Sequence, residues 1–287
     1  MAGFRNIAQW AQSATSGKNW ISSFRKVPAV TTIAGQWFDF STAAGNPVPN
    51  YYASSPLTAA ILDAEKGIIH GPNISPDKKF IQRIIFMNSG AATTANLPVY
   101  FLDYLLYYPF IDMDAAGDDQ LFDNNTPLPR YEDGAGVKMM LVAQATTIGG
   151  GLFTVNYTNQ DGVSGRVTPQ HFCASAQNTG ALVSATTAAA GVHPFLTLQS
   201  GDTGVQSVQS INFSIANGGL AAIVLVKPLQ TIQSFENNGQ PVERENIRQN
   251  SSPPEIKDGA FISFIGQTTG GTVSAGVFAG TLETIWS

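Results

Sequence analysis

The sequence has few charged residues. Asp, Glu, Lys and Arg make up 12% of its 287 residues, against about 25% in an average soluble domain. The formal net charge is −5, and no basic tract occurs in the chain. Binding to nucleic acid by neutralising phosphates is therefore not expected. Because charged side chains normally keep a free protein soluble, this composition favours a protein that docks against neighbours.

Cysteine and long apolar runs are also scarce. The single cysteine, Cys173, excludes an intramolecular disulfide and favours the cytoplasm, or an assembly made there. The longest uninterrupted apolar run, Leu220 to Val226, is too short to span a bilayer. The first six residues lack a basic region followed by an apolar stretch, so we expect neither a signal peptide nor a membrane partner.

Motifs for catalysis are weak. His171 and Cys173 lie two residues apart, which on a strand places both side chains on one face. A Cys–His nucleophile pair is one interpretation, although neighbouring strand residues pack together by default. Asp202 stands in an Asp-Thr-Gly triplet of the aspartic-protease type, but polar residues precede it and no second triplet occurs, so we interpret it as a turn. We expect no enzyme activity, no catalytic residue and no cofactor.

An acidic segment is a weak candidate for a metal site. Asp112, Asp114, Gly117 and Asp123 fall at positions 1, 3, 6 and 12 of a calcium loop. Position 5 is Ala116, which has no side-chain oxygen, and position 12 is Asp rather than the longer Glu. We interpret the segment as a solvated acidic loop. A loosely bound cation is the second interpretation, and a pair of catalytic carboxylates is the third.

Most of the chain predicts antiparallel β-structure. Phe153, Val155 and Tyr157 alternate with polar residues, as in a half-buried strand. The strongest hairpin signal is the turn at residues 217–219, between apolar runs on either side. Residues 57–66 fit either a helix or a short strand. The other expected strands cover residues 37–40, 79–88, 98–109, 137–146, 163–168, 205–216, 220–229, 260–265 and 272–286.

These strands predict a mainly β fold, an antiparallel β-sandwich or jelly-roll-like domain over residues 29–287 with a short helical arm over residues 1–28. Apolar residues at helical spacing run through the arm until Pro28. The arm could lie on the chain's own core or on a partner. We favour the partner, because four large aromatics exceed what a short surface helix needs; they are Phe4, Trp10, Trp20 and Phe24.

The richest aromatic run extends from Tyr100 to Phe110 and includes Tyr104, Tyr107 and Tyr108. Aromatic side chains on a strand are usually core or subunit interface, and a sugar-binding platform is the alternative. We take the three tyrosines as candidate interface residues. Together with the low charge, they favour a homo-oligomer, with a trimer as the preferred form.

Several stretches resemble structural proteins of tailed bacteriophage particles: residues 35–39, 45–52, 102–112 and 128–131. The resemblance covers most of the chain but contains no catalytic motif, so no functional residue carries over. It implies a virion component encoded among head genes and assembled in the host cytoplasm. Our first hypothesis is a capsid decoration (head cement) protein, with the phage major capsid protein or other virion proteins as partners. A tail-associated or receptor- or carbohydrate-binding module is the second, and a hydrolase with an unrecognised site the third.

Overall fold

The computed structural model describes residues 3–30, 35–89, 97–173, 178–183, 193–234, 240–249, 252–267 and 276–287. These residues form mainly antiparallel β-structure with one short N-terminal helix, which confirms the predicted fold class. The elements are α1 (Ile7–Thr15), β1 (Asn19–Val27), β2 (Trp37–Asp39), η1 (Phe40–Thr42), β3 (Ala44–Asn46), β4 (Ala60–Ile61), η2 (Ala64–Lys66), β5 (Lys79–Ser89), β6 (Leu97–Asp112), β7 (Gln120–Leu121), β8 (Lys138–Ala143), β9 (Leu152–Asn159), β10 (Arg166–Val167), β11 (His171–Phe172), β12 (Val205–Phe213), β13 (Leu220–Ser234), β14 (Val242–Glu245), α2 (Asn246–Gln249), β15 (Glu255–Ile256), β16 (Phe261–Gln267) and β17 (Val277–Trp286).

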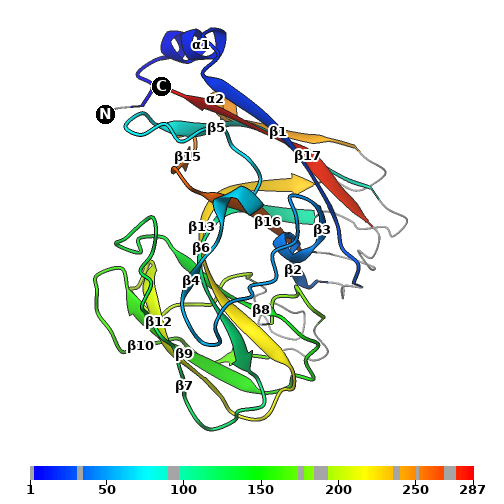
Figure 1. Cartoon of the computed structure of the whole chain (residues 1–287), viewed down its shortest axis with the longest axis vertical. Coiled ribbons are helices and arrows are strands. Elements are labelled where there is room, and N and C mark those ends of the chain that lie inside the picture. Colours follow the sequence, from blue (N-terminus) through cyan, green and yellow to red (C-terminus); the bar gives the residue numbers. More distant parts are fainter. Residues whose placement is uncertain are drawn as a thin grey trace.

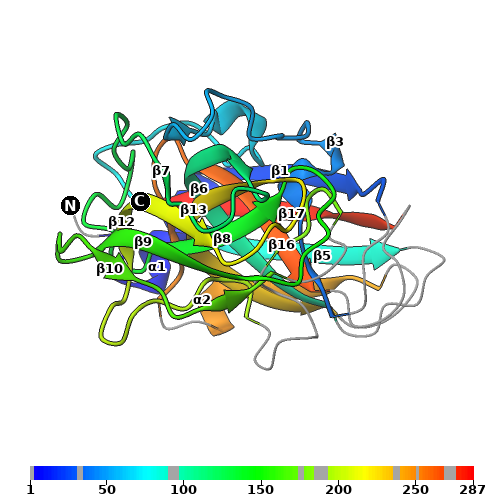
Figure 2. The same ribbon diagram turned by 90° about the horizontal axis from the view of Figure 1, so that it is seen from below.

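The strands form three sheets, which we name by their place in Figure 1. The upper sheet has the order β14-β5-β17-β1-β3, with β15 on β5. The central sheet has the order β2-β16-β6-β13-β8, with β4 on β6. The lower sheet has the order β10-β9-β12-β7, with β11 on β9. In Figure 2, which views the molecule from below, the lower sheet lies in front of β6 and β13.

The two longest strands, β6 and β13, connect the halves of the molecule. Their antiparallel pairing extends from Leu220–Asp112 to Ser234–Leu97 and contains three register shifts. Such bulges bend a strand, so one long strand pair can pack against the upper sheet at one end and against the lower sheet at the other. On one face, Phe101 belongs to a core under the upper sheet and Leu105 to a core over the lower sheet. Asp103 lies between them on β6 and pairs with Arg130 at 2.6 and 2.9 Å.

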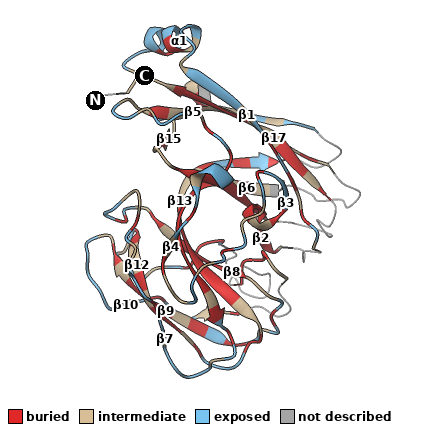
Figure 3. Ribbon diagram, in the orientation of Figure 1, coloured by how far each residue is buried: buried red, intermediate tan, exposed pale blue. Residues whose placement is uncertain are grey.

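Aromatic side chains dominate the upper core. The ring centroids of Phe24, Phe86, Phe101 and Phe264 lie 5.4–6.3 Å apart in all their pairs. Offset and edge-to-face contacts of this kind add to the free energy of burial. The opposite face of the central sheet carries a third apolar cluster, in which Tyr104 and Val224 pack against Tyr52 and Phe195 from loops. The central sheet is therefore buried on both faces (Figure 3).

Two local predictions are wrong. The helical arm ends at Thr15, and residues 19–27 form β1 inside the upper sheet, where buried Phe24 and Lys26 alternate with exposed Ser23 and Arg25. The predicted hairpin at residues 217–219 does not exist, since β12 pairs with β9 and β7 whereas β13 pairs with β6 and β8. The turn instead carries the chain between two sheets. Its Asn217 is fully buried, and the side-chain Oδ1 accepts from the Gly151 N–H at 2.9 Å.

Other local predictions hold with altered bounds. Residues 57–66 contain the two-residue strand β4 and the 3-10 turn η2 rather than an α-helix. The expected strand at 163–168 shortens to β10, which pairs with β9 as a hairpin. Of the last expected strand, residues 277–286 form β17, and residues 272–275 lie outside the described residues.

Candidate functional site

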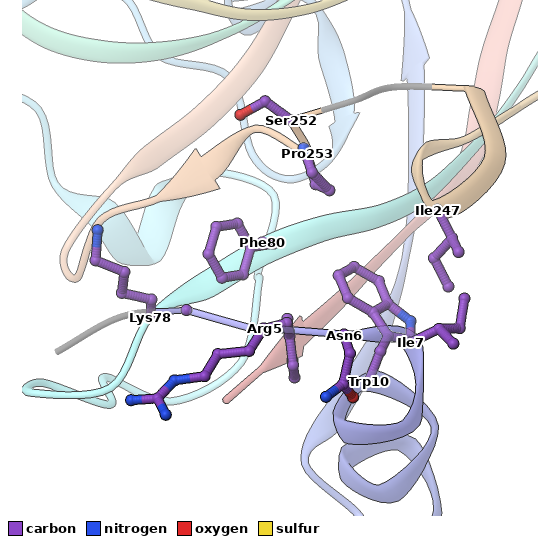
Figure 4. Close-up of a pocket in the computed structure, with 11 residues that line it drawn as sticks. Arg5, Asn6, Ile7, Trp10, Lys78, Phe80, Ile247, Ser252 and Pro253 are labelled. Atoms are coloured by element: carbon purple, nitrogen blue, oxygen red, sulfur yellow. The ribbon is translucent and has the colours of Figure 1, made fainter.

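The N-terminal arm closes one side of an open groove. Asn6 caps α1, because its Oδ1 accepts from the Gln9 N–H at 2.9 Å. The Phe4 ring lies 4.6 Å from that of Trp10 and 5.8 Å from that of Phe80 on β5. The groove has a volume of about 430 Å³, and Ile247 and Pro253 form its other wall (Figure 4).

The structure divides the four aromatics of the predicted arm. Trp10 is 7% exposed and packs against the chain's own surface, and Phe24 is 2% exposed inside the upper core. Neither Trp10 nor Phe24 is therefore an interface residue, which corrects the prediction for both. Trp20 is 43% exposed at the start of β1 and donates through Nε1 to the Ser22 Oγ at 2.9 Å. Phe4 is half-buried and lines the groove.

The aromatic run on β6 belongs to the interior. Tyr104 and Tyr108 are fully buried, and Tyr107 is 7% exposed. The Tyr108 hydroxyl donates to the Asn124 Oδ1 at 2.7 Å and accepts from the Val208 N–H at 3.1 Å. These three tyrosines are core residues, so their proposed role as interface residues is wrong, and they offer no platform for a sugar. They lie on the central sheet, where both faces are covered.

A buried carboxylate that the sequence did not reveal lies above that run. Asp39 accepts hydrogen bonds from the Tyr52 hydroxyl, from the Tyr104 hydroxyl at 2.6 Å, and from Ser41 Oγ and N–H at 2.8 and 2.9 Å. Burial raises the pKa of Asp39 despite these donors. Asp39 is 0% exposed, so it organises the fold rather than meeting a ligand.

Two buried lysines are held by backbone carbonyls. The Lys26 Nζ donates to the carbonyls of Pro47 at 2.7 Å and Ala43 at 3.1 Å. The Lys79 Nζ donates to the Pro72 carbonyl at 2.6 Å and to the His70 Nδ1 at 3.1 Å. Burial lowers the pKa of each lysine to about 8. Both ammonium groups cross-link loops to the upper sheet.

The acidic segment does not converge on a metal site. The Asp112 Oδ1 accepts from the Asp114 N–H at 2.9 Å, and the Asp114 Oδ1 accepts from the Gly218 N–H at 2.7 Å. Asp123 instead binds the Asn125 side chain at 2.6 Å. Among the residues that the structure describes, no group of three or more His, Cys, Asp or Glu side chains could hold a metal ion.

The other candidate catalytic residues, Cys173, His171 and Asp202, are held by packing and hydrogen bonds within the fold. Cys173 is fully buried, and burial raises the pKa of its thiol to about 12, which opposes formation of the nucleophilic thiolate. The His171 ring packs on Phe153, 5.4 Å between centroids. Asp202 stands in a turn, as interpreted from the sequence, and accepts from Tyr157, Asn159 and Arg166 at 2.5–3.1 Å.

Comparisons with known proteins add no family. No protein-family model and no curated protein sequence matches the chain. Among solved structures, the chain is similar to one titled "Structure of infectious bursal disease virus Gt strain", with 9% identity over 94% of this chain and 79% of that one. The TM-score is 0.19, which carries no argument about fold or function. Within the described part of the chain, no helix is long and apolar enough to cross a membrane.

Proposed function

We propose that the protein is a structural component of a bacteriophage virion that decorates the capsid through protein–protein contacts and carries out no turnover. One observation carries the proposal: a charge-poor chain keeps 13 large apolar side chains at least 37% exposed among its described residues. Scattered exposed apolar residues are ordinary on any protein. With only 12% charged residues, however, little on this surface opposes close packing against neighbours.

The end of the molecule around α1 is the surface we propose to face the capsid. Ile7 is 67% exposed and lines the groove beside Phe4 and Phe80. Trp20, 43% exposed, follows α1 in the chain and lies near the start of β1, which is at the same end of the molecule (Figure 1). Burying such side chains on a repeated lattice gains free energy at every copy.

The first test is the location and copy number of the protein in purified phage particles. Mass spectrometry of intact particles should find it at a copy number in fixed ratio to the major capsid protein, and imaging should place it on the head. Presence in tails alone would favour the tail-associated or receptor-binding alternative. Absence from particles would overturn the virion proposal.

The second test probes the proposed face. Ile7→Glu should reduce occupancy on particles that lack the protein, because it places a charge in the groove. Ile148→Glu is the matched control, since Ile148 is 76% exposed in the lower half of the molecule. Equal loss in both variants would show that the groove is not the contact.

A further inference from the structure

The first half of β1 is an open edge of the upper sheet. β1 pairs with β17 over residues 19–26, whereas β3, its other neighbour, pairs only with residues 25–27. Residues 19–23 thus have a strand on one side only within the described sheet. Figure 3 colours the start of β1 as exposed. We call residues 19–23 the β1 edge.

The backbone groups of this edge have a definite direction. The Lys18 carbonyl accepts from the Trp286 N–H at 3.1 Å, so even-numbered residues direct their backbone groups toward β17. The Ser23 carbonyl accepts from the Asn46 Nδ2 at 3.1 Å, on the β3 side. Because a strand has a period of two, the N–H and C=O of Asn19 and Ile21 also point away from β17.

Ile21 lies at the middle of this edge. Its side chain is 62% exposed, and among the described residues its outward N–H and C=O have no backbone partner. Natural edge strands are usually protected by a charged residue, a proline or a covering segment. The β1 edge contains no charge and no proline, and the nearest charges in sequence are Lys18 and Arg25.

We propose that the β1 edge is a homodimer interface, in which two copies pair antiparallel about a two-fold axis at Ile21. Each Ile21 N–H then donates to the carbonyl of the partner subunit's Ile21, and the two upper sheets become one continuous sheet. Asn19 stands opposite the partner's Ser23. β3 limits the pairing to this short segment, so we expect a concentration-dependent dimer.

The sequence of the edge favours a second copy as the occupant. Antiparallel self-pairing brings the large apolar side chain of Ile21 against itself and keeps neutral polar residues on either side. Cross-strand pairs of this kind stabilise a sheet, whereas like charges directly opposite would destabilise it. A two-fold contact is also the commonest way in which identical chains associate. This inference does not rest on the proposed virion function, and it proposes a dimer where the sequence favoured a trimer.

The test is the oligomeric state of the full chain in solution. Sedimentation equilibrium should show a monomer–dimer equilibrium for the wild type. Ile21→Pro removes an N–H that β17 does not use, and Ile21→Lys places two like charges on the axis; each should raise the dimer Kd about tenfold or more. Val163→Lys, at a side chain 50% exposed in the lower half, should leave the Kd unchanged.

A cross-linking experiment tests the register. The Cα atoms of a hydrogen-bonded antiparallel pair lie about 5.5 Å apart, within reach of a disulfide. Ile21→Cys should therefore form a disulfide-linked dimer under oxidation, while Ser23→Cys, which meets the partner's Asn19, should not. The circular dichroism spectrum identifies any variant that fails to fold. If Ile21→Pro or Ile21→Lys does not fold, the oxidative cross-linking of Ile21→Cys decides whether the proposed dimer exists. A wild type that stays monomeric, or a dimer that forms no Ile21→Cys cross-link, would overturn the proposal.

Discussion

The central sheet and the lower sheet each have an aspartate bound by tyrosine hydroxyls, yet the two carboxylates differ in their pKa shifts. Asp39 on β2 of the central sheet is fully buried and has only hydroxyl and amide donors, and burial raises its pKa. Asp202 in the lower half has a side chain 3% exposed and receives two bonds from Arg166, which lowers its pKa to about 2. A guanidinium does not by itself set the direction of the shift, because Asp103 pairs with Arg130 and burial still raises its pKa to about 6. The balance between burial and the charged donor decides each pKa, and Asp202 is less buried than Asp39.

The two aspartates therefore change stability with pH in opposite directions. Asp39 binds its proton more tightly in the folded state, so its contribution falls as pH rises from near 4 toward its folded pKa. Asp202 contributes fully above pH 4, and that contribution is lost as pH falls toward 2.

The largest expected effect comes from removing the Asp39 carboxylate. Asp39→Ala removes the acceptor shared by the buried donors of Tyr52, Tyr104 and Ser41, which we expect to cost about 3–5 kcal/mol of unfolding free energy. Urea denaturation at pH 7 measures it. Asp77→Ala, which removes an exposed ion pair with Lys18, is the control and should cost less than about 1 kcal/mol. Equal costs would contradict a structural role for Asp39.

The next effect concerns acid stability of the upper half. Burial, then the charge of Lys79, lowers the pKa of His70 to about 4, so the folded state resists its protonation. Stability is expected to fall by roughly 2–3 kcal/mol as pH drops from 6.5 to 4. His70→Gln should flatten this part of the pH profile, measured by urea denaturation at several pH values. An unchanged slope would assign the acid sensitivity to another group.

The smallest effect tests the guanidinium of the lower half. Arg166→Met should raise the pKa of Asp202 from about 2 toward the ordinary range of an aspartate, because the hydrogen bonds from Arg166 are the largest cause of its lowered pKa. NMR titration of the Asp202 carboxyl carbon gives that pKa directly. We expect the variant to stay folded at pH 7, because Tyr157 and Asn159 still donate to Asp202. A pKa that stays near 2 would show that these two donors suffice.

Strand positions were predictable where side chains alternate and neighbours are polar. Phe153, Val155 and Tyr157 face the lower core as predicted, since period-two patterning directly reports a half-buried strand. β1 was misread because Trp20, Ile21 and Phe24 also fit helical spacing. Its inward Lys26 breaks the apolar pattern, and burial of that residue is possible only because loop carbonyls surround its ammonium group.

Partners of the strands were not predictable in the same way. The Asn-Gly turn after β12 has the local chemistry of a hairpin, but its side chain hydrogen-bonds Gly151 and the chain crosses to another sheet. The candidate interface tyrosines of β6 were equally ambiguous, because a strand buried on both faces and a strand at a subunit contact are both rich in aromatics.

The sequence by itself determined the mainly β class, the positions of most long strands and the scarcity of charge on the surface. Only the tertiary structure decided that β1 joins the upper sheet, that Asp39, Lys26 and Lys79 are buried, and that the β1 edge is open. The physical reason is that side-chain period and turn chemistry are local, whereas sheet order and the donors around a buried charge come from residues distant in the chain.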